Sequence, residues 1–150
     1  MKVVIQRVRR ASVAIGGEQK SFIGNGMLIL LGVAVGDTEE DIDWLIKKVV
    51  ALRIFDDQQG VMNLDVRQVD GDVMVVSQFT LLASTKKGNR PSYIHAAPPA
   101  EAVPLYELFC KRMSEQSGKE VATGTFGADM QVGLVNDGPV TICIDSRNKE

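Results

Sequence analysis

Only two segments of this 150-residue chain have the 3.6-residue periodicity of an amphipathic helix, whereas its other apolar runs have the length of strands. Residues 38–52 and 99–116 are therefore predicted to be helices. Pro104 lies inside the second segment and is expected to kink that helix or delay its start. The two predicted apolar stripes are Ile42, Leu45, Ile46, Val49 and Val50, followed by Val103, Tyr106, Phe109, Cys110 and Met113.

The remaining apolar runs predict strands. Residues 3–15 form a long run that ends at Gly16-Gly17, a pair typical of a hairpin turn. A period of two places Arg7 on the same face as Val3 and Ile5, which is unusual for a solvated charge. Many strands, several turn signals and two helices predict a β-rich mixed α/β fold, with a mostly antiparallel sheet and both helices packed on it. The other predicted strands are residues 27–35, 72–82, 121–125, 130–135 and 140–144.

Composition narrows the class of protein. The length suits a single domain, residues 1–150, with a polar C-terminal tail at 146–150. The net charge of −2 gives no global basic field, so we expect no DNA partner, and an RNA partner would be bound locally. The longest apolar run, residues 27–35, is too short to cross a bilayer. Cys110 and Cys143 have no metal-ligand spacing and are expected to be reduced, partly buried thiols in a cytoplasmic protein, with a disulfide as the less favoured alternative.

The side chains available for catalysis are few. The one histidine, His95, cannot build a multi-histidine zinc site, so neither a metal nor a cofactor is expected. Ser77 and Thr80 are the candidate hydroxyl nucleophiles, yet a nucleophile needs a neighbouring base and this segment contains none. Ser77-Gln78 interrupts an apolar run with polar groups, which an interior strand tolerates only where those groups find partners. A structural role for both hydroxyls remains an alternative.

Residues 136–141, Asn-Asp-Gly-Pro-Val-Thr, contain a turn signal just before the last predicted strand. Asp137-Gly138 favours a turn, and Pro139 can make that turn rigid. From the residues alone, the segment is interpreted as a hairpin corner.

The segments 77–81 (Ser-Gln-Phe-Thr-Leu) and 136–141 resemble the two signature motifs of the D-aminoacyl-tRNA deacylase family, also called the D-tyrosyl-tRNA deacylase family. Each motif is short, but further similar segments follow in the same order across nearly the whole chain. They are Gln6-Arg7-Val8, Ala11-Ser12-Val13, Arg53-Ile54-Phe55, Met62-Asn63-Leu64, Arg90-Pro91-Ser92, Leu105-Tyr106 and residues 126–132.

The resemblance implies bent sheets with a barrel-like core. It also implies a homodimer that hydrolyses the ester between a D-amino acid and the 3′-terminal adenosine of tRNA, as chiral proofreading in translation. Glycyl-tRNA is expected as a side substrate because glycine has no side chain to exclude. The alternatives are a small-molecule esterase with a Thr or Ser nucleophile, and a non-catalytic dimeric module that binds an RNA end.

The resemblance also suggests roles for individual residues. Backbone N–H groups around Gln78, Phe79 and Thr80, next to Ser77, are expected to stabilise the oxyanion. The remaining expected positions bind substrate. Gly138-Pro139, with a cis peptide bond, would enter the partner's site, Arg7 would hold that corner, and Met130 would complete the set.

Overall fold

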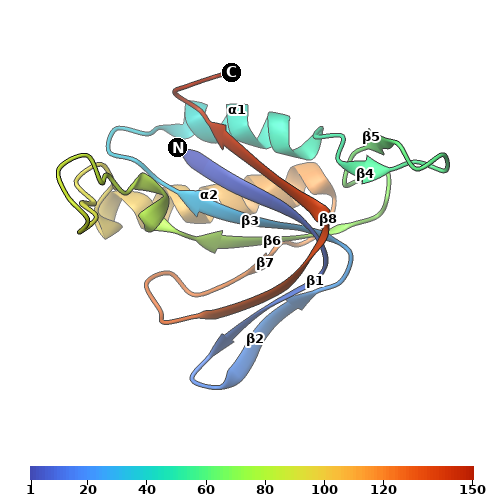
Figure 1. Cartoon of the computed structure of the whole chain (residues 1–150), viewed down its shortest axis with the longest axis horizontal. Helices are drawn as coiled ribbons and strands as arrows, with labels where there is room; N and C mark the ends of the chain where they lie inside the picture. The colour runs from blue at the N-terminus through green and yellow to red at the C-terminus, as the bar shows by residue number, and fades with distance from the viewer.

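The computed structural model describes all residues from 1 to 150, in eight strands, two α-helices and one 3₁₀ helix (Figure 1). No helix is long and apolar enough to span a membrane. The elements are β1 (Lys2–Ile15), β2 (Glu18–Ile23), β3 (Gly26–Gly32), α1 (Glu39–Val50), β4 (Phe55–Asp56), β5 (Met62–Leu64), β6 (Asp72–Ser77), η1 (Phe79–Leu82), α2 (Pro99–Ser117), β7 (Ala122–Thr123) and β8 (Gln131–Asp145).

Strand β1 organises the main sheet. It pairs antiparallel with β2, β3 and β8, and the sheet continues from β3 through β6 to β7 by parallel pairing. The hairpin at Gly16-Gly17 is confirmed, because β1 and β2 pair directly across it. Strands β1 and β8 bend together, so their far halves curl with β2 below the rest of the sheet (Figure 1). The β-rich mixed fold with a barrel-like core is thereby confirmed, with a parallel portion around β6 that the sequence did not predict.

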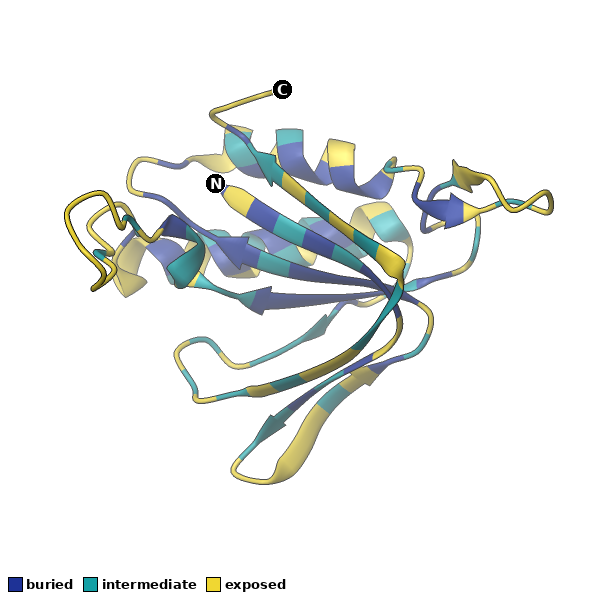
Figure 2. Ribbon diagram, in the orientation of Figure 1, coloured by how far each residue is buried: buried dark blue, intermediate teal, exposed yellow.

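Both helices pack against the same face of the sheet. The main core of 23 buried residues lies between them and includes Val3, Ile5 and Phe109. A second cluster of seven buried residues fills the curled half of the sheet. Figure 2 shows the buried residues along the central strands and the helices, with exposed residues in the loops between them. The two helices and the curled sheet therefore use opposite faces of the same strands.

The two helices were predicted almost to the residue. All five residues of the α1 stripe are buried. Helix α2 begins at Pro99 and ends before Gly118, which adopts the left-handed conformation, and it contains Pro104 without a delayed start. Of the two outcomes expected from Pro104, a kink or a delayed start, the delayed start does not occur. Pro104 is the sixth residue of the helix. Because proline has no backbone N–H, only the hydrogen bond to the carbonyl of Ala100 is lost.

The hairpin corner interpreted at residues 136–141 was wrong. Strand β8 runs continuously from Gln131 to Asp145, and both of its halves pair with β1. The pairing register shifts between Gln6 and Val8 and again between Val8 and Arg10, so the segment is a bulge rather than a reversal. Asn136 spans the bulge, since its side chain accepts from the Val140 N–H at 2.9 Å. A bulge suits this position because β1 itself bends here.

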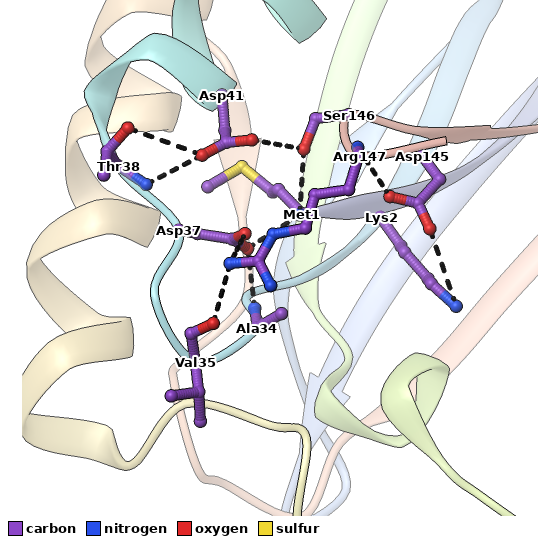
Figure 3. Close-up of polar contacts among 10 residues, drawn as sticks. All are labelled: Met1, Lys2, Ala34, Val35, Asp37, Thr38, Asp41, Asp145, Ser146 and Arg147. Atoms are coloured by element: carbon purple, nitrogen blue, oxygen red, sulfur yellow. Dashed lines mark hydrogen bonds and ion pairs between the residues drawn. The ribbon is translucent and has the colours of Figure 1, made fainter. Parts of the chain in front are cut away.

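The N-terminus is buried in a polar cluster (Figure 3). The Met1 ammonium lies 2.8 Å from Asp37 Oδ2, with both groups fully buried, and donates to Ser146 Oγ at 3.0 Å. Ser146 in turn donates to Asp41 Oδ1 at 2.6 Å. The guanidinium of Arg147 lies 2.9 Å from Asp37 Oδ1, without the alignment of a hydrogen bond. The polar tail predicted at 146–150 is thus anchored at its first two residues.

Candidate active site

The Ser77–Thr80 segment lies where β6 ends and η1 begins. The Gln78 N–H donates to the carbonyl of Leu31 at 2.8 Å, which holds the chain against β3 after the last ladder pair. The first bond of η1 runs from the Leu81 N–H to the Gln78 carbonyl, and the bond at its C-terminal cap runs from the Ala83 N–H to the Thr80 carbonyl. The N–H groups of Phe79 and Thr80 precede these bonds, and such N–H groups have no acceptor within the helix.

The side chains of this segment offer no general base. The contact of the Thr80 hydroxyl is a short one with the side-chain amide of Gln78, in which the amide donates. An amide cannot take a proton from the hydroxyl, so nothing here activates Thr80 as a nucleophile. The Phe79 ring is 52% exposed and packs edge-on against Tyr93, with ring centroids 5.0 Å apart. The segment therefore presents backbone donors and an aromatic ring to solvent.

Arg7 is buried, as its position beside Val3 and Ile5 predicted. Its Nη1 donates to the carbonyl of Ile54 at 2.7 Å, and its Nε donates to the carbonyl of Asp137 at 3.0 Å. Asp56 adds a carboxylate oxygen 3.2 Å from Nη1. Arg7 thus ties the β8 bulge to the segment that follows α1, and its charge is compensated where it is buried.

The Gly138-Pro139 peptide bond is cis, as the resemblance implied, and both residues are exposed. Gly138 has φ +128°, and a Cβ placed on it would lie 2.9 Å from Arg7 Nη2 and 3.0 Å from Val140 Cγ2. A residue with a side chain at position 138 would therefore be strained by the backbone conformation and would displace the Arg7 guanidinium or Val140.

The two signature segments lie at opposite ends of the sheet. In the strand pairing, Arg7 beside the bulge is opposite Met27 on β3, and Met27 is opposite Val73 at the start of β6. Ser77 lies at the other end of β6. Ser77 lies four residue steps after Val73, roughly 13 Å at the rise of a strand. Figure 1 shows the same separation, with η1 and the β8 bend on opposite sides of the view. One chain alone does not bring the two segments together.

Met130 lies just before β8 and packs against the smaller core cluster, to which Val76 belongs. Its sulfur occupies the space that a Cβ on Gly124 would need. Met130 is therefore near the β6 side of the molecule rather than beside Gly138.

Sequence reasoning missed the surroundings of the segment. A groove of about 520 Å³ opens beside the end of η1, and its lining includes Leu82, Ala83 and His95. The side chain of His95 is exposed, and its carbonyl accepts from the Val35 N–H at 3.0 Å. No three His, Cys, Asp or Glu side chains are grouped so as to hold a metal ion. The exposed pair of Phe79 and Tyr93 could not be found from spacing, because the loop between them sets their contact.

The two cysteines are free thiols. Burial raises the pKa of Cys110 to about 11. Cys143 is exposed on β8, more so than the sequence predicted. Neither cysteine lies in residues 77–81 or 136–141.

Comparison with known proteins identifies the family. The family model described as D-Tyr-tRNA(Tyr) deacylase matches residues 4–145. A protein of Bacteroides thetaiotaomicron named D-aminoacyl-tRNA deacylase is 64% identical over 150 residues, covering all of both chains. Proteins of the same name from Porphyromonas gingivalis and Flavobacterium johnsoniae are 61% and 57% identical, again over both full lengths.

Two solved structures share the fold. One, named c-Myc DNA Unwinding Element Binding Protein, has a TM-score of 0.91 at 40% identity and covers 97% of this chain and 98% of its own. The other, described as a probable eukaryotic D-amino acid tRNA deacylase, has a TM-score of 0.80 at 16% identity and covers 95% and 97%. The second likeness concerns the fold alone. With a family model over residues 4–145 and full-length relatives at 57–64% identity, this chain belongs to the D-Tyr-tRNA(Tyr) deacylase family.

Proposed function

We propose that this protein hydrolyses the ester bond of D-aminoacyl-tRNA, releasing the free D-amino acid and tRNA. The observation that carries this proposal is that the chain is 64% identical, over the full length of both proteins, to a protein named D-aminoacyl-tRNA deacylase. The role is chiral proofreading in the cytoplasm, and glycyl-tRNA is a side substrate because glycine has no side chain for a chiral filter to exclude.

Backbone donors carry the chemistry in this proposal. Water attacks the ester carbonyl carbon, and the N–H groups of Phe79 and Thr80 stabilise the oxyanion that forms. When the intermediate collapses, the C–O bond to the ribose 3′-oxygen breaks and that oxygen takes a proton. The 2′-hydroxyl of the same ribose assists the attacking water. The aminoacyl ester is already activated, so positioning and charge stabilisation replace a protein nucleophile.

Chiral selection requires the second segment. We infer that the protein acts as a homodimer in which Gly138-Pro139 of one subunit enters the site formed by Ser77–Thr80 of the other. The separation of the two segments within one chain supports this arrangement, as does the exposure of Gly138, Pro139 and Phe79. Backbone atoms form a wall that cannot rotate away, and Arg7 fixes that wall from behind. Met130 contributes an apolar contact on the β6 side.

The decisive experiment compares matched D- and L-tyrosyl-tRNA as substrates for the purified protein. Hydrolysis of the D form with little or none of the L form supports the proposal. Equal rates on the two, or no hydrolysis of the D form, overturn it. A simple ester such as p-nitrophenyl acetate is included, because turnover of that ester without turnover of D-tyrosyl-tRNA would identify a small-molecule esterase instead.

A further inference from the structure

The charged side chains of the segment around the candidate site are all cationic. Residues 73–100 contain no Asp or Glu, although the whole chain has 19 acidic residues and a net charge of −2. The same segment contains Lys86, Lys87 and Arg90 within five residues. A stretch with three cations and no acidic residue is thus continuous with the proposed catalytic segment.

The three cations have no partner in the fold. None of them takes part in an ion pair or a side-chain hydrogen bond, whereas many other basic side chains do. All residues from 85 to 91 are exposed, as Figure 2 shows for this loop at the end of the molecule that carries η1. Unpaired exposed cations on a loop retain their full charge for an external anion.

The loop is fixed to the candidate site rather than free. Its two ends are joined by backbone hydrogen bonds between Ser84 and Ser92, at 2.8 and 2.9 Å. Tyr93 follows the second of these residues, and its ring contacts Phe79. The loop that carries the three cations is therefore joined at its base to the segment that contains Phe79.

We propose that Lys86, Lys87 and Arg90 bind the backbone phosphates of the tRNA acceptor strand next to its terminal adenosine. This inference rests on the proposed function, because the RNA end at Phe79 determines which polyanion reaches the loop. Phosphate contacts supply affinity without sequence readout. Such contacts allow an acidic protein, which has no globally basic surface, to bind tRNA locally at the end of the RNA.

The test compares two double variants that each remove two unpaired, exposed lysines. One is K86A/K87A in the loop, and its matched control is K47A/K111A on the helices. Each protein is assayed on D-tyrosyl-tRNA and on D-tyrosyl-adenosine, which has the same ester and no phosphate. The salt dependence of uncharged tRNA binding is measured in parallel by fluorescence anisotropy.

Each phosphate-binding lysine contributes about 1 to the slope of log affinity against log salt, so K86A/K87A is expected to lower that slope by about 2. When salt is raised from about 50 to 200 mM, the loss of tRNA affinity in this variant should therefore be roughly 16-fold smaller than the loss in the wild-type protein. The ratio of kcat/KM on D-tyrosyl-tRNA to that on D-tyrosyl-adenosine should fall in the loop variant, through KM, and stay at the wild-type value in the control.

The proposal is overturned if the loop variant keeps the wild-type slope and ratio, or if the control changes as much as the loop variant. Failure of the proposed function looks different. The wild-type protein would not hydrolyse D-tyrosyl-tRNA, while the anisotropy slopes would still report on the loop.

Discussion

Arg7 and Gly138 are in mutual contact across the β8 bulge: the Nη2 atom of Arg7 lies 2.9 Å from the point that a Cβ on Gly138 would occupy. The same guanidinium donates to the carbonyls of Ile54 and Asp137, so it cannot swing away without losing both bonds. The position of the bulge therefore depends on the buried guanidinium of Arg7 and on the lack of a side chain at Gly138.

Gly138→Ala should reduce kcat/KM on D-tyrosyl-tRNA by about 10²-fold, because the added methyl group displaces the bulge and a misplacement of about 1 Å can cost that much. Gly127→Ala is the matched control. Gly127 also has a positive φ, at +77°, but nothing lies within 4 Å of its Cβ position. Equal losses in the two variants would show that backbone conformation alone matters and that the contact with Arg7 does not.

Arg7→Lys should lower the free energy of unfolding by about 1–3 kcal/mol, since a lysine cannot reach both carbonyls and leaves one buried acceptor unpaired. Urea unfolding followed by circular dichroism measures the change. Arg9→Lys serves as the control, because the Arg9 side chain is 71% exposed and lies 3.3 Å from an Asp137 carboxylate oxygen. If Arg9→Lys is as destabilising as Arg7→Lys, the burial of Arg7 has no special role.

Thr80→Ala and Ser77→Ala should each retain D-tyrosyl-tRNA hydrolysis to within about tenfold, because the proposed oxyanion donors are backbone groups and a single donor is worth about 10²–10³. Loss of a true nucleophile costs far more, about 10⁶ in a serine protease. Single-turnover kinetics with mass spectrometry of the quenched enzyme is the measurement. An acyl group trapped on Thr80, or complete inactivity of Thr80→Ala, would contradict the backbone mechanism.

Asp37→Ala should destabilise the fold by about 3–5 kcal/mol, because it leaves the fully buried Met1 ammonium without its carboxylate. Asp145→Ala is the control. Its Oδ2 lies 3.7 Å from the 45% exposed Lys2 and its Oδ1 accepts from the exposed Arg147 N–H at 2.9 Å, so removing this carboxylate should cost clearly less, about 1 kcal/mol. Thermal and urea unfolding distinguish the two variants, and similar losses would argue against a stabilising role for the buried ammonium.

Cys143 should react with iodoacetamide at pH 8 in the native protein, and Cys110 should not. Burial raises the pKa of the Cys110 thiol to about 11, so this group stays protonated well above pH 8, and it is less exposed than Cys143. Peptide mapping after a timed reaction gives the two rates, with the protein unfolded in urea as the reference. Rapid modification of native Cys110 would show that helix α2 opens readily.

The sequence by itself determined the helices, most strands and the identity of the candidate residues. The apolar stripe of α1 follows from spacing along one helix, and the burial of Arg7 follows from alternation along β1. These are local properties, because the side-chain period of a helix or strand is set within a few residues. The match of residues 77–81 and 136–141 to family motifs is likewise a property of short segments in a fixed order.

Only the tertiary structure decided what residues 136–141 do. Asp137-Gly138 suits a hairpin as well as a bulge, and the choice depends on whether both flanking strands pair with the same neighbour. Here they do, because β1 is 14 residues long and bends, which no local pattern reports. The separation of Ser77 from Gly138 and the contact of Phe79 with Tyr93 also depend on strand register and loop closure, which are long-range pairings. Local sequence patterns identify the candidate residues, whereas packing between distant segments decides which of these residues come into contact.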